Sequence, residues 1–489
     1  MRLLLSHVIS VRRFANGFLR TPLPLGAPIA CFDNIYHSDC AAHQLAHKLL
    51  MRVLAVSQLY PRRSDGSAGL FIHRLHRELP RFNVEPDVIQ QLDWAPPWPI
   101  SSLRAEWRRA RRDLSDVSDE LDGVRIRHPT VFWPRPSRFF PADPWHRRAN
   151  SLVRYFAARP DVASADVILA HFVVPDGYYA LMLGRALSIP VAVMAWGDDL
   201  HAWPTERLDW RQRLRFVLKH ANLLIGCSQQ MVADGNSWLD QPRSDWQVVY
   251  GGVDLGLFAP PPADHSQDRS KLWSRELGVD IADDRVLLML ARATSAKGYI
   301  ELLDAWSRLS HERANWRLVM IGANGDLDVR REISRRGIAA HAHWLGPRSP
   351  DLMPSVLRAS DAFVLPSHNE GLSLSVLEAL ATGLPTITTR VGGHAEAIRQ
   401  PCEGWLVAPR NVDELTNAIR SMMKSRADWP RRREFARRAA ERIGSPTTNA
   451  QRLATALGQI AHASGGNSYP RARGPAGEAR FTSSVGLDR

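Results

Sequence analysis

The chain has 489 residues, of which 45% are hydrophobic and 23% charged, and its formal net charge is +13. One hydrophobic core does not extend over this length, so we expect two or three domains. No apolar run reaches the roughly 18 residues that a membrane-spanning helix needs, so no transmembrane helix is expected. The positive charge favours anionic ligands or an anionic surface, and the chain shows no RNA- or DNA-binding signature, so nucleic acid is not an expected partner.

The four cysteines form no CxxC pair and no zinc-like spacing with histidine. We therefore expect a reducing, cytoplasmic location and no structural metal. The cysteines are Cys31, Cys40, Cys227 and Cys402.

Residues 1–50 carry four arginines before their first acid, Asp33. Two interpretations are open: a targeting segment, or a translation start placed upstream of the true one at Met51, which we favour. In both cases we expect this segment to lack stable structure.

From Met51 onward, short apolar runs alternate with helical stretches. Such runs are typical of parallel strands that are buried on both faces. Residues 93–123 interrupt this pattern and are interpreted as an insertion with one helix. Strands are predicted at 52–57, 84–90, 124–132, 166–170, 190–196, 222–227 and 246–250, and helices at 68–79, 146–158, 176–187, 207–220 and 228–238.

A second series follows the proline-rich linker at 259–270. Two such series predict an α/β chain with two Rossmann-like domains that face each other across a cleft, each with a parallel sheet. We place the domains at 51–257 and 258–428, and expect a disordered tail at 461–489. The strands of the second series are predicted at 286–290, 318–321, 342–345, 362–365, 386–388 and 405–407.

Two glutamates, Glu370 and Glu378, stand where the second series turns from a strand into a helix. We expect that helix to begin at Gly371 and to end near Gly383 and Pro385. Its first N–H groups, from Gly371 through Leu372 and Ser373 to Leu374, would be free to hold an anion. Carboxylates that accept from sugar hydroxyls, next to amides that hold a diphosphate, suit a nucleotide-sugar.

The segment from Pro366 to Pro385 resembles the family-4 retaining glycosyltransferases, whose signature is two glutamates with seven residues between them at such a turn. The resemblance covers about residues 51–460 and implies the GT-B fold, with C-terminal helices at 429–460 that cross back to the first domain. It implies a retaining, hexosyltransferase-like enzyme of bacterial polysaccharide biosynthesis. Glu370 is then expected to contact the transferred sugar, and Glu378 the ribose. Ser373 departs from the glycine that the family often has there.

A departing diphosphate needs cations aimed at its oxygens. Arg292 and Lys297 follow a predicted strand and resemble the arginine and lysine that flank the donor diphosphate in this family. Two such cations can replace a divalent metal, so we expect neither a metal nor another cofactor. An Asp-x-Asp at Asp326 to Asp328 is expected to start a helix away from the two glutamates.

The N-terminal domain is expected to bind the acceptor. Gly66 and Gly69 lie after the first strand and are candidates for an acceptor or phosphate loop, or for an ordinary turn. His171 is a candidate catalytic residue or a buried supporting histidine. Related enzymes often carry a histidine where this chain has Trp196, and a Trp can stack on a sugar but cannot transfer a proton. Asp198 or Asp199 then becomes the candidate polar group, and we take Asp198 as the third catalytic candidate beside Glu370 and His171.

Three other segments have two interpretations each. The basic stretch from Arg104 to Arg112 is either a solvated helix or a peripheral contact with the inner face of an anionic membrane, where a lipid-linked acceptor resides. Gly251 is expected at a hinge between the domains. The glycines at 392–393 close a turn, either near the nucleotide base or for structure alone.

The leading hypothesis is a metal-independent transfer of sugar from a nucleotide-sugar to a glycan, lipid-linked or small-molecule acceptor. A nucleotide-sugar epimerase or hydrolase on the same architecture is an alternative, and so is a non-catalytic nucleotide-sugar-binding protein. A Rossmann oxidoreductase is disfavoured, because no Gly-x-Gly-x-x-Gly follows the first strand of either series.

Overall fold

The computed structural model describes residues 50–63, 68–95, 97, 100–103, 105–131, 144–159, 164–201, 208–261, 269, 271–281 and 284–463. The predictions for the leader, for the tail, for Gly66 and for most of the linker lie outside these residues. The chain divides into two units at Leu50 and Met51. Everything below concerns the second unit.

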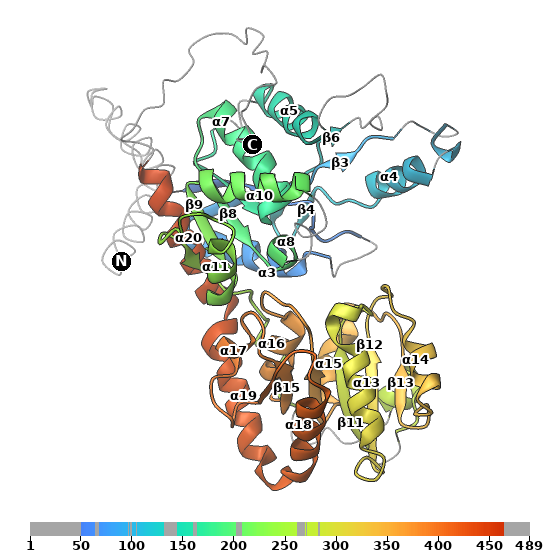
Figure 1. The fold of residues 1–489 in the computed structure, drawn as a ribbon. Coiled ribbons are helices and arrows are strands. Elements are labelled where there is room, and N and C mark those ends of the chain that lie inside the picture. Colours follow the sequence, from blue (N-terminus) through green and yellow to red (C-terminus); the bar gives the residue numbers. More distant parts are fainter. Residues whose placement is uncertain are drawn as a thin grey trace, which may run out of the picture. The chain divides into compact units, whose positions relative to one another are not determined.

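The N-terminal half is built on a sheet of eight strands in the order β10-β9-β8-β7-β1-β2-β5-β4. The apolar runs of the sequence form its centre, because strands that are covered on both faces need no polar side chain. Helices lie on both faces of the sheet (Figure 1). The strands are β1 (Met51–Val56), β2 (Val84–Ile89), β4 (Glu120–Leu121), β5 (Val124–Arg127), β7 (Val167–His171), β8 (Val191–Ala195), β9 (Leu223–Gly226) and β10 (Gln247–Val248).

One edge of this sheet differs from the wholly parallel sheet that we predicted. Strand β4 pairs antiparallel with β5. Asp122 and Gly123 join them, both with positive φ, at 48° and 79°. A two-residue turn with this backbone closes a hairpin, so the chain reverses here without a crossover helix. The predicted strand at 124–132 is also split, since β6 (Thr130–Val131) leaves the sheet and pairs with β3 (Leu92–Asp93).

The C-terminal half has six parallel strands in the order β13-β12-β11-β14-β15-β16. With both sheets, the prediction of two Rossmann-like parallel-sheet domains is confirmed. In each sheet the strand order reverses beside its first strand, between β1 and β7 and between β11 and β14. Such switch points are where open α/β sheets bind ligands, outside the carboxyl ends of the strands. The strands are β11 (Arg285–Leu290), β12 (Trp316–Ile321), β13 (Ala342–Trp344), β14 (Ala362–Leu365), β15 (Thr386–Thr389) and β16 (Trp405–Val407).

The helices follow the strands along the chain, as the alternating pattern predicted. In the N-terminal half they are α3 (Leu70–Glu78), α4 (Ala105–Ser115), α5 (Pro144–Ala157), α7 (Tyr178–Leu187), α8 (Asp198–His201), α10 (Leu208–His220) and α11 (Gln229–Asn236). In the C-terminal half they are α13 (Tyr299–Arg308), α14 (Val329–Arg335), α15 (Met353–Arg358), α16 (Leu374–Ala381), α17 (His394–Ala397), α18 (Val412–Lys424), α19 (Trp429–Gly444) and α20 (Pro446–Ala463).

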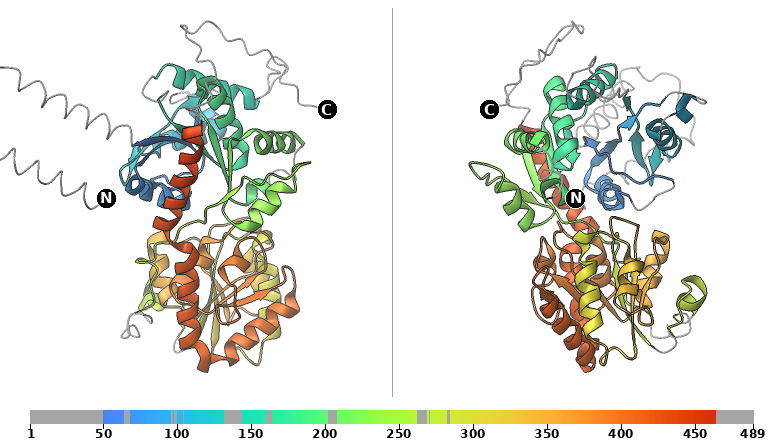
Figure 2. Two further views of the ribbon diagram at one scale, coloured as in Figure 1. Left: turned by 90° about the vertical axis from the view of Figure 1, so that its left-hand side faces the viewer. Right: turned by 45° about the vertical axis from the view of Figure 1, so that its right-hand side comes forward.

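The last helix returns to the N-terminal half. Ala450, Leu453 and Leu457 of α20 are fully buried in the hydrophobic core of the first sheet. Figure 2 shows this helix beside the first strands and α3. The two halves are therefore joined by packed side chains as well as by the linker.

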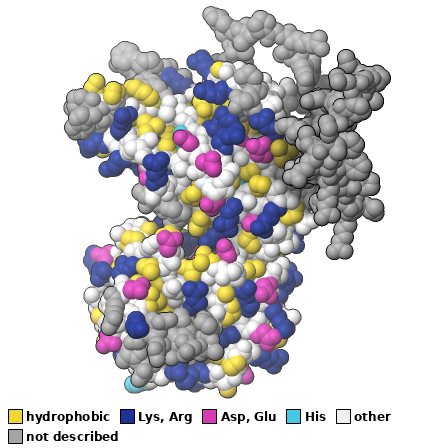
Figure 3. Space-filling view, turned by 180° about the vertical axis from the view of Figure 1, so that it is seen from behind, with side chains coloured by type: hydrophobic (Ala, Val, Ile, Leu, Met, Phe, Trp, Pro, Cys, Tyr) yellow, Lys and Arg dark blue, Asp and Glu magenta, His cyan; other side chains and the backbone are white. Residues whose placement is uncertain are grey.

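Basic side chains are spread over the surface rather than gathered in one place. Figure 3 shows Lys and Arg over both halves, with acidic side chains among them. On α4, Arg108, Arg109, Arg111 and Arg112 are all exposed. None of the helices within the described ranges is long and apolar enough to cross a membrane.

Candidate active site

The predicted donor residues meet at the switch point of the C-terminal sheet. Strand β11 ends at Leu290, and Arg292 and Lys297 follow it. Strand β14 ends at Leu365, and Glu370 follows it. Because β11 and β14 are neighbours in the sheet, these two loops lie side by side. Parallel pairing thus brings a carboxylate and a cation together although 73 residues separate them.

Glu370 is held by two donors. Its Oε1 accepts from Lys297 Nζ at 2.7 Å and from Ser367 Oγ at 2.8 Å. The side chains of Glu370 and Lys297 are 12% and 21% exposed. Burial acts to raise the pKa of Glu370, but the charge of Lys297, the neighbouring His394 and the hydrogen bonds from Lys297 and Ser367 together outweigh burial and leave the pKa below its ordinary value. The carboxylate is therefore ionised and fixed in place at neutral pH.

Arg292 is more open than Lys297. Its Nη2 lies 3.9 Å from Oδ2 of Asp198, and both side chains are more than half exposed. A loose pair of this kind contributes little to stability. It does place Asp198, from the N-terminal half, opposite the cation of the C-terminal half.

Asp326 contacts the loop that carries Lys297, although we expected the Asp-x-Asp to lie away from the two glutamates. Its carboxylate accepts from the N–H of Ser295 at 3.1 Å and from Ser295 Oγ at 3.2 Å. Asp328 instead caps α14 by accepting from the N–H of Arg331. Within the described part of the chain, no group of three or more His, Cys, Asp or Glu side chains could hold a metal ion.

Helix α16 begins at Leu374, three residues after the predicted start at Gly371. Ser373 occupies the capping position, but its side chain caps no N–H group and its Oγ instead lies 3.1 Å from Ser375 Oγ. The first turn of α16 thus has no side-chain cap, which leaves its N–H groups suited to an anion. Leu372 lies in the loop before this turn.

Gly371 packs directly on the N-terminal half. A methyl group on its Cα would lie 1.8 Å from the carbonyl oxygen of Trp196 and 2.7 Å from Cys227 Sγ. Gly392 packs as tightly from the other side, where a methyl group would lie 1.9 Å from the carbonyl oxygen of Glu370. The two glycines let three backbone segments meet at the residue after the first glutamate.

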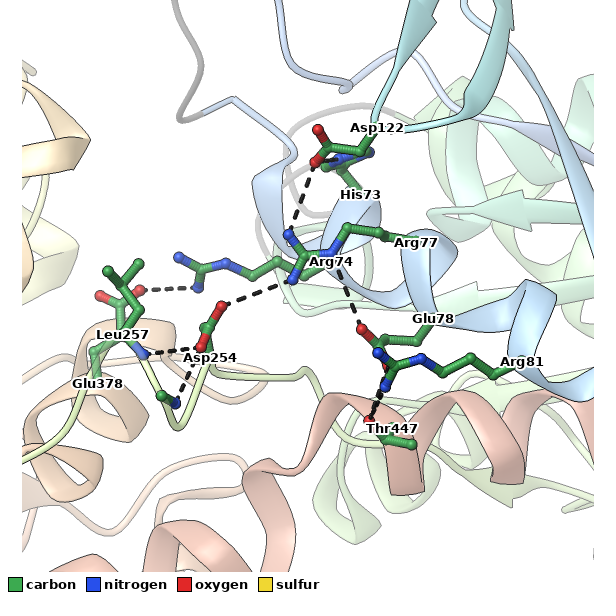
Figure 4. Close-up of polar contacts among 11 residues, drawn as sticks. His73, Arg74, Arg77, Glu78, Arg81, Asp122, Asp254, Leu257, Glu378 and Thr447 are labelled. Atoms are coloured by element: carbon green, nitrogen blue, oxygen red, sulfur yellow. Dashed lines mark hydrogen bonds and ion pairs between the residues drawn. The ribbon is translucent and has the colours of Figure 1, made fainter.

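Glu378 lies on α16 and is bound by an arginine that the sequence did not single out. Arg74 on α3 donates to Glu378 Oε1 at 3.0 Å, across 304 residues of sequence (Figure 4). The two side chains are 9% and 14% exposed. Burial raises the pKa of Glu378, and Arg74 opposes this rise. The sequence signal that could have pointed to this contact is the repeated arginine at positions 74, 77 and 81.

Arg77 and Arg81 extend this contact along α3. Arg77 lies 3.7 Å from both Asp254 and Asp122. Arg81 lies 2.6 Å from Glu78, which also accepts from Thr447 of α20 (Figure 4). One face of α3 therefore carries an ion pair from Arg74 to the C-terminal half and accepts a hydrogen bond at Glu78 from the returning helix.

His171 is placed differently from a residue that touches a substrate. It has no exposed surface. Its Nδ1 accepts from Trp196 Nε1 at 3.3 Å, and its Nε2 lies 2.8 Å from His76 Nε2. Burial lowers the pKa of His171 to about 3. With both ring nitrogens occupied by protein, His171 supports Trp196.

Of the two adjacent aspartates after β8, only Asp198 is exposed. Asp199 is fully buried and accepts three backbone N–H groups, from Val173, Trp196 and Gly197. These bonds tie the ends of β7 and β8 together. Asp199 is thus a structural residue of the turn that presents Asp198.

Gly69 directly precedes α3, with φ of 72°. A methyl group there would lie 2.3 Å from the carbonyl oxygen of Leu59, so the close approach of the chain after β1 requires glycine. Glu396, after the second glycine turn, accepts from the N–H groups of Gln229 and Gln230 and from Tyr250. This carboxylate stabilises the first turn of α11.

Two family models match the chain. The model described as "Glycosyltransferase Family 4" matches residues 68–257, and the model described as "Glycosyl transferases group 1" matches residues 277–442. These ranges contain most of the first sheet and the whole second sheet with the paired glutamates. The fold and the site together define a glycosyltransferase of the GT-B class.

Relatives carry the same description. The chain is 24% identical to the putative teichuronic acid biosynthesis glycosyltransferase TuaC of Bacillus subtilis, over 76% of this chain and 88% of that protein. It is 30% identical to the D-inositol 3-phosphate glycosyltransferase of Corynebacterium jeikeium over 42% of this chain, a match that spans about half the length of that relative. This chain belongs to the group 1 glycosyltransferases, with an N-terminal domain of the family 4 type.

Solved structures share the fold. Sucrose-phosphate synthase from Thermosynechococcus elongatus has a TM-score of 0.66 at 17% identity, over 84% of this chain and 100% of that one. Anabaena HepE in complex with UDP-glucose has a TM-score of 0.62 at 19% identity, over the same shares. The GT-B prediction is confirmed.

Proposed function

We propose that this glycosyltransferase moves a sugar from a nucleotide-sugar to a glycan, lipid-linked or small-molecule acceptor, with retention of anomeric configuration and without a metal ion. The observation that carries the proposal is the pairing of Glu370 with Lys297 at the switch point of the donor sheet. HepE has been solved in complex with UDP and with UDP-glucose, which supports a nucleotide-sugar donor here.

The chemistry follows from the charges. As the bond from the anomeric carbon to the diphosphate breaks, positive charge grows on the sugar and negative charge on the leaving oxygen. Glu370 is ionised and fixed, so it stabilises the sugar without reorganisation. Lys297 and Arg292 stabilise the diphosphate, together with the uncapped N–H groups of α16. A metal ion would have the same task, and two organic cations make it unnecessary.

The other predicted residues take supporting roles. Glu378 accepts from the ribose hydroxyls while Arg74 holds its orientation. Asp198 is exposed opposite Arg292 and faces the acceptor side. Gly69 shapes the loop before α3. The exposed arginines of α4 are the part of the chain that would meet an anionic membrane if the acceptor is lipid-linked.

The Glu370→Gln variant tests this function. We expect turnover to fall about 100-fold or more, because the electrostatic stabilisation is lost in the transition state. Donor binding, measured by thermal shift across UDP-, GDP- and ADP-sugars, should stay within a few-fold. Glu441→Gln on α19, an exposed residue paired with Arg437, serves as the control and should be unaffected. Wild-type turnover in Glu370→Gln would overturn the assignment.

The stereochemical and metal predictions have their own readouts. NMR of the product should show the anomeric configuration of the donor, and inversion would contradict retention. Activity should persist in excess EDTA; its loss, with recovery on Mg²⁺ or Mn²⁺, would contradict metal independence. Nucleotide release without acceptor product would favour the epimerase or hydrolase alternative.

A further inference from the structure

A chain of six polar side chains runs through the core of the N-terminal half. It begins at Trp196 after β8, passes through His171 on β7 and His76 on α3, continues through Tyr60 and His73, and ends at Asp122. The four central members are at most 2% exposed. Burying a polar group without a hydrogen-bond partner costs free energy, so a series of four buried polar side chains requires an explanation.

The links form an unbroken series. In order from Trp196, the atom pairs are Trp196 Nε1 to His171 Nδ1 at 3.3 Å, His171 Nε2 to His76 Nε2 at 2.8 Å, His76 Nδ1 to Tyr60 OH at 3.5 Å, Tyr60 OH to His73 Nδ1 at 3.0 Å, and His73 Nε2 to Asp122 Oδ2 at 2.9 Å. Every ring nitrogen of the three histidines takes part.

The two ends decide the direction of all these bonds. An indole N–H can only donate, and a carboxylate can only accept. His171 must therefore accept at Nδ1 and donate from Nε2. His76 then accepts at Nε2 and donates from Nδ1 to the hydroxyl of Tyr60. That hydroxyl donates to His73, whose Nε2–H donates to Asp122. Each histidine is restricted to one tautomer.

This arrangement needs neutral imidazoles, because a protonated ring would present two N–H groups. Burial lowers the pKa of His171 and of His76, and the neighbouring rings of His171 and His73 lower the pKa of His76 further. Burial lowers the pKa of His73 as well, against the opposing effect of Asp122; Arg74 and Arg77, which also face it, add to the lowering. At neutral pH each ring therefore has the single N–H that the series requires.

Trp196 lies where the two halves meet. Its ring is 4.5 Å from that of Phe71 and is stacked at 28° on His171. Its carbonyl oxygen touches Gly371, the residue after Glu370. A Cβ on Gly251 would lie 3.6 Å from both Trp196 Cζ3 and Leu374 Cδ2, so the indole also borders the start of α16. A shift of this indole would therefore change the packing at the start of α16, four residues after Glu370.

We propose that the hydrogen-bond chain from Asp122 to Trp196 positions the indole of Trp196 at the site, so that His171, His76, Tyr60 and His73 are positioning residues. Trp196 thereby presents a fixed aromatic surface, and the histidines of the hydrogen-bond chain lie in the layer behind it. The effect on transfer rests on the proposed function. The positioning of the indole does not.

Tyr60→Phe is the sharpest test, because it removes one hydroxyl in the middle of the chain and leaves both ends intact. In protein labelled with 5-fluorotryptophan, the Trp196 resonance is the one that Trp196→Phe removes. We expect Tyr60→Phe to shift or broaden that resonance. In protein labelled with [15N]histidine, the signals of His76 and His73 should shift, because His76 Nδ1–H loses its acceptor and His73 Nδ1 loses its donor. Transfer should fall about 10- to 100-fold in kcat, since a small displacement near the reacting groups is costly, with donor affinity unchanged.

Tyr179→Phe is the matched control, since Tyr179 is a buried tyrosine of the neighbouring core cluster and is not a member of the hydrogen-bond chain. It should leave the Trp196 resonance in place. An unchanged resonance in Tyr60→Phe, or equal changes in both variants, would overturn the proposal. These spectra need no turnover, so they also distinguish failure of this inference from failure of the proposed function.

A second pair of variants does not disturb the core. Asp122 is half exposed in a hairpin turn with positive φ, which Gly and Asn both adopt readily. Asp122→Gly removes the terminal acceptor, whereas the amide oxygen of Asp122→Asn can still accept from His73. We expect mixed His73 tautomers and a changed Trp196 resonance only in Asp122→Gly. Identical spectra in both variants would contradict a chain anchored at Asp122.

Discussion

At the scale of single residues, the site depends on one partly buried ion pair. A carboxylate as enclosed as Glu370 would tend to take up a proton, and Lys297 prevents this at 2.7 Å. The same ammonium group must also meet the donor diphosphate in the proposed function. One lysine thus links the ionisation of the sugar-facing carboxylate to the binding of the leaving group, so its loss should have two separable effects.

Lys297→Met should weaken donor binding and turnover together, because a diphosphate cation acts in both the ground state and the transition state. It should also change the pH profile. Lys297 holds the pKa of Glu370 below 4.5, and without it burial raises that pKa. The ionised form is then lost at a higher pH as the solution is acidified, so the acidic limb of kcat/KM should move upward.

Lys424→Met, at the exposed end of α18, is the control for loss of a lysine charge. Its pH profile should match the wild type. If the Lys297→Met profile also superimposed on the wild type, with unchanged nucleotide affinity, the ion pair would have no role in the reaction.

At the scale of elements, α3 has more roles than its sequence suggested. Its buried face contributes His73 and His76 to the hydrogen-bond chain, and Arg74 reaches Glu378 on α16. A helix in the N-terminal half therefore orients a carboxylate of the donor site. In the proposed function, binding of the nucleotide and contact between the halves are therefore coupled through this one side chain.

Arg74→Met should raise the dissociation constant for the nucleotide about tenfold or more, since a hydrogen bond to a charged group contributes roughly 1.5–3 kcal/mol. Without its partner, Glu378 is buried and uncompensated, so its pKa should rise further. Titration calorimetry with the nucleotide selected in the donor screen measures the effect. Arg81→Met, which leaves Glu378 untouched, should bind normally. Equal affinity in all three proteins would show that Arg74 does not serve the donor site.

At the scale of the whole molecule, the two halves meet through backbone as well as through side chains. Gly371 and Gly197 touch, and the N–H of Val253 donates to the carbonyl of Gly444 just before α20. Helix α20 then buries its apolar face in the first core. Because glycine has no side chain, the two backbone segments approach each other more closely here than any other residue would allow.

Gly371→Ala should block this approach, because its methyl group would lie 1.8 Å from Trp196 O. We expect turnover to fall about 100-fold, while each half stays folded and the nucleotide still stabilises the protein. Small-angle scattering should give a larger radius of gyration than the wild type at saturating nucleotide. Gly458→Ala on α20, where a methyl group meets nothing within 4 Å, is the control. A Gly371→Ala protein as compact and as active as the wild type would refute the close contact.

Much of the fold and part of the candidate site could be predicted from the sequence alone, because they depend on local sequence patterns. Short apolar runs without alternation are typical of strands covered on both faces, and they predicted the two sheets apart from the antiparallel edge strand β4. The carboxyl ends of neighbouring strands converge, so Glu370 and Lys297 could be placed together before any contact was known.

The features that only the tertiary structure decided join residues that lie far apart along the chain. Arg74 and Glu378 are 304 residues apart, and no local pattern predicts their ion pair. Helix α16 begins at Leu374 and not at Gly371, where we predicted its start. Gly371 packs against Trp196 instead. His171 was a candidate catalyst by its position after a strand; its role is set by His76 and Trp196, which come from two other elements and occupy both of its nitrogens. Local sequence selects which groups can react, whereas burial and partners from distant segments decide which of them are free to do so.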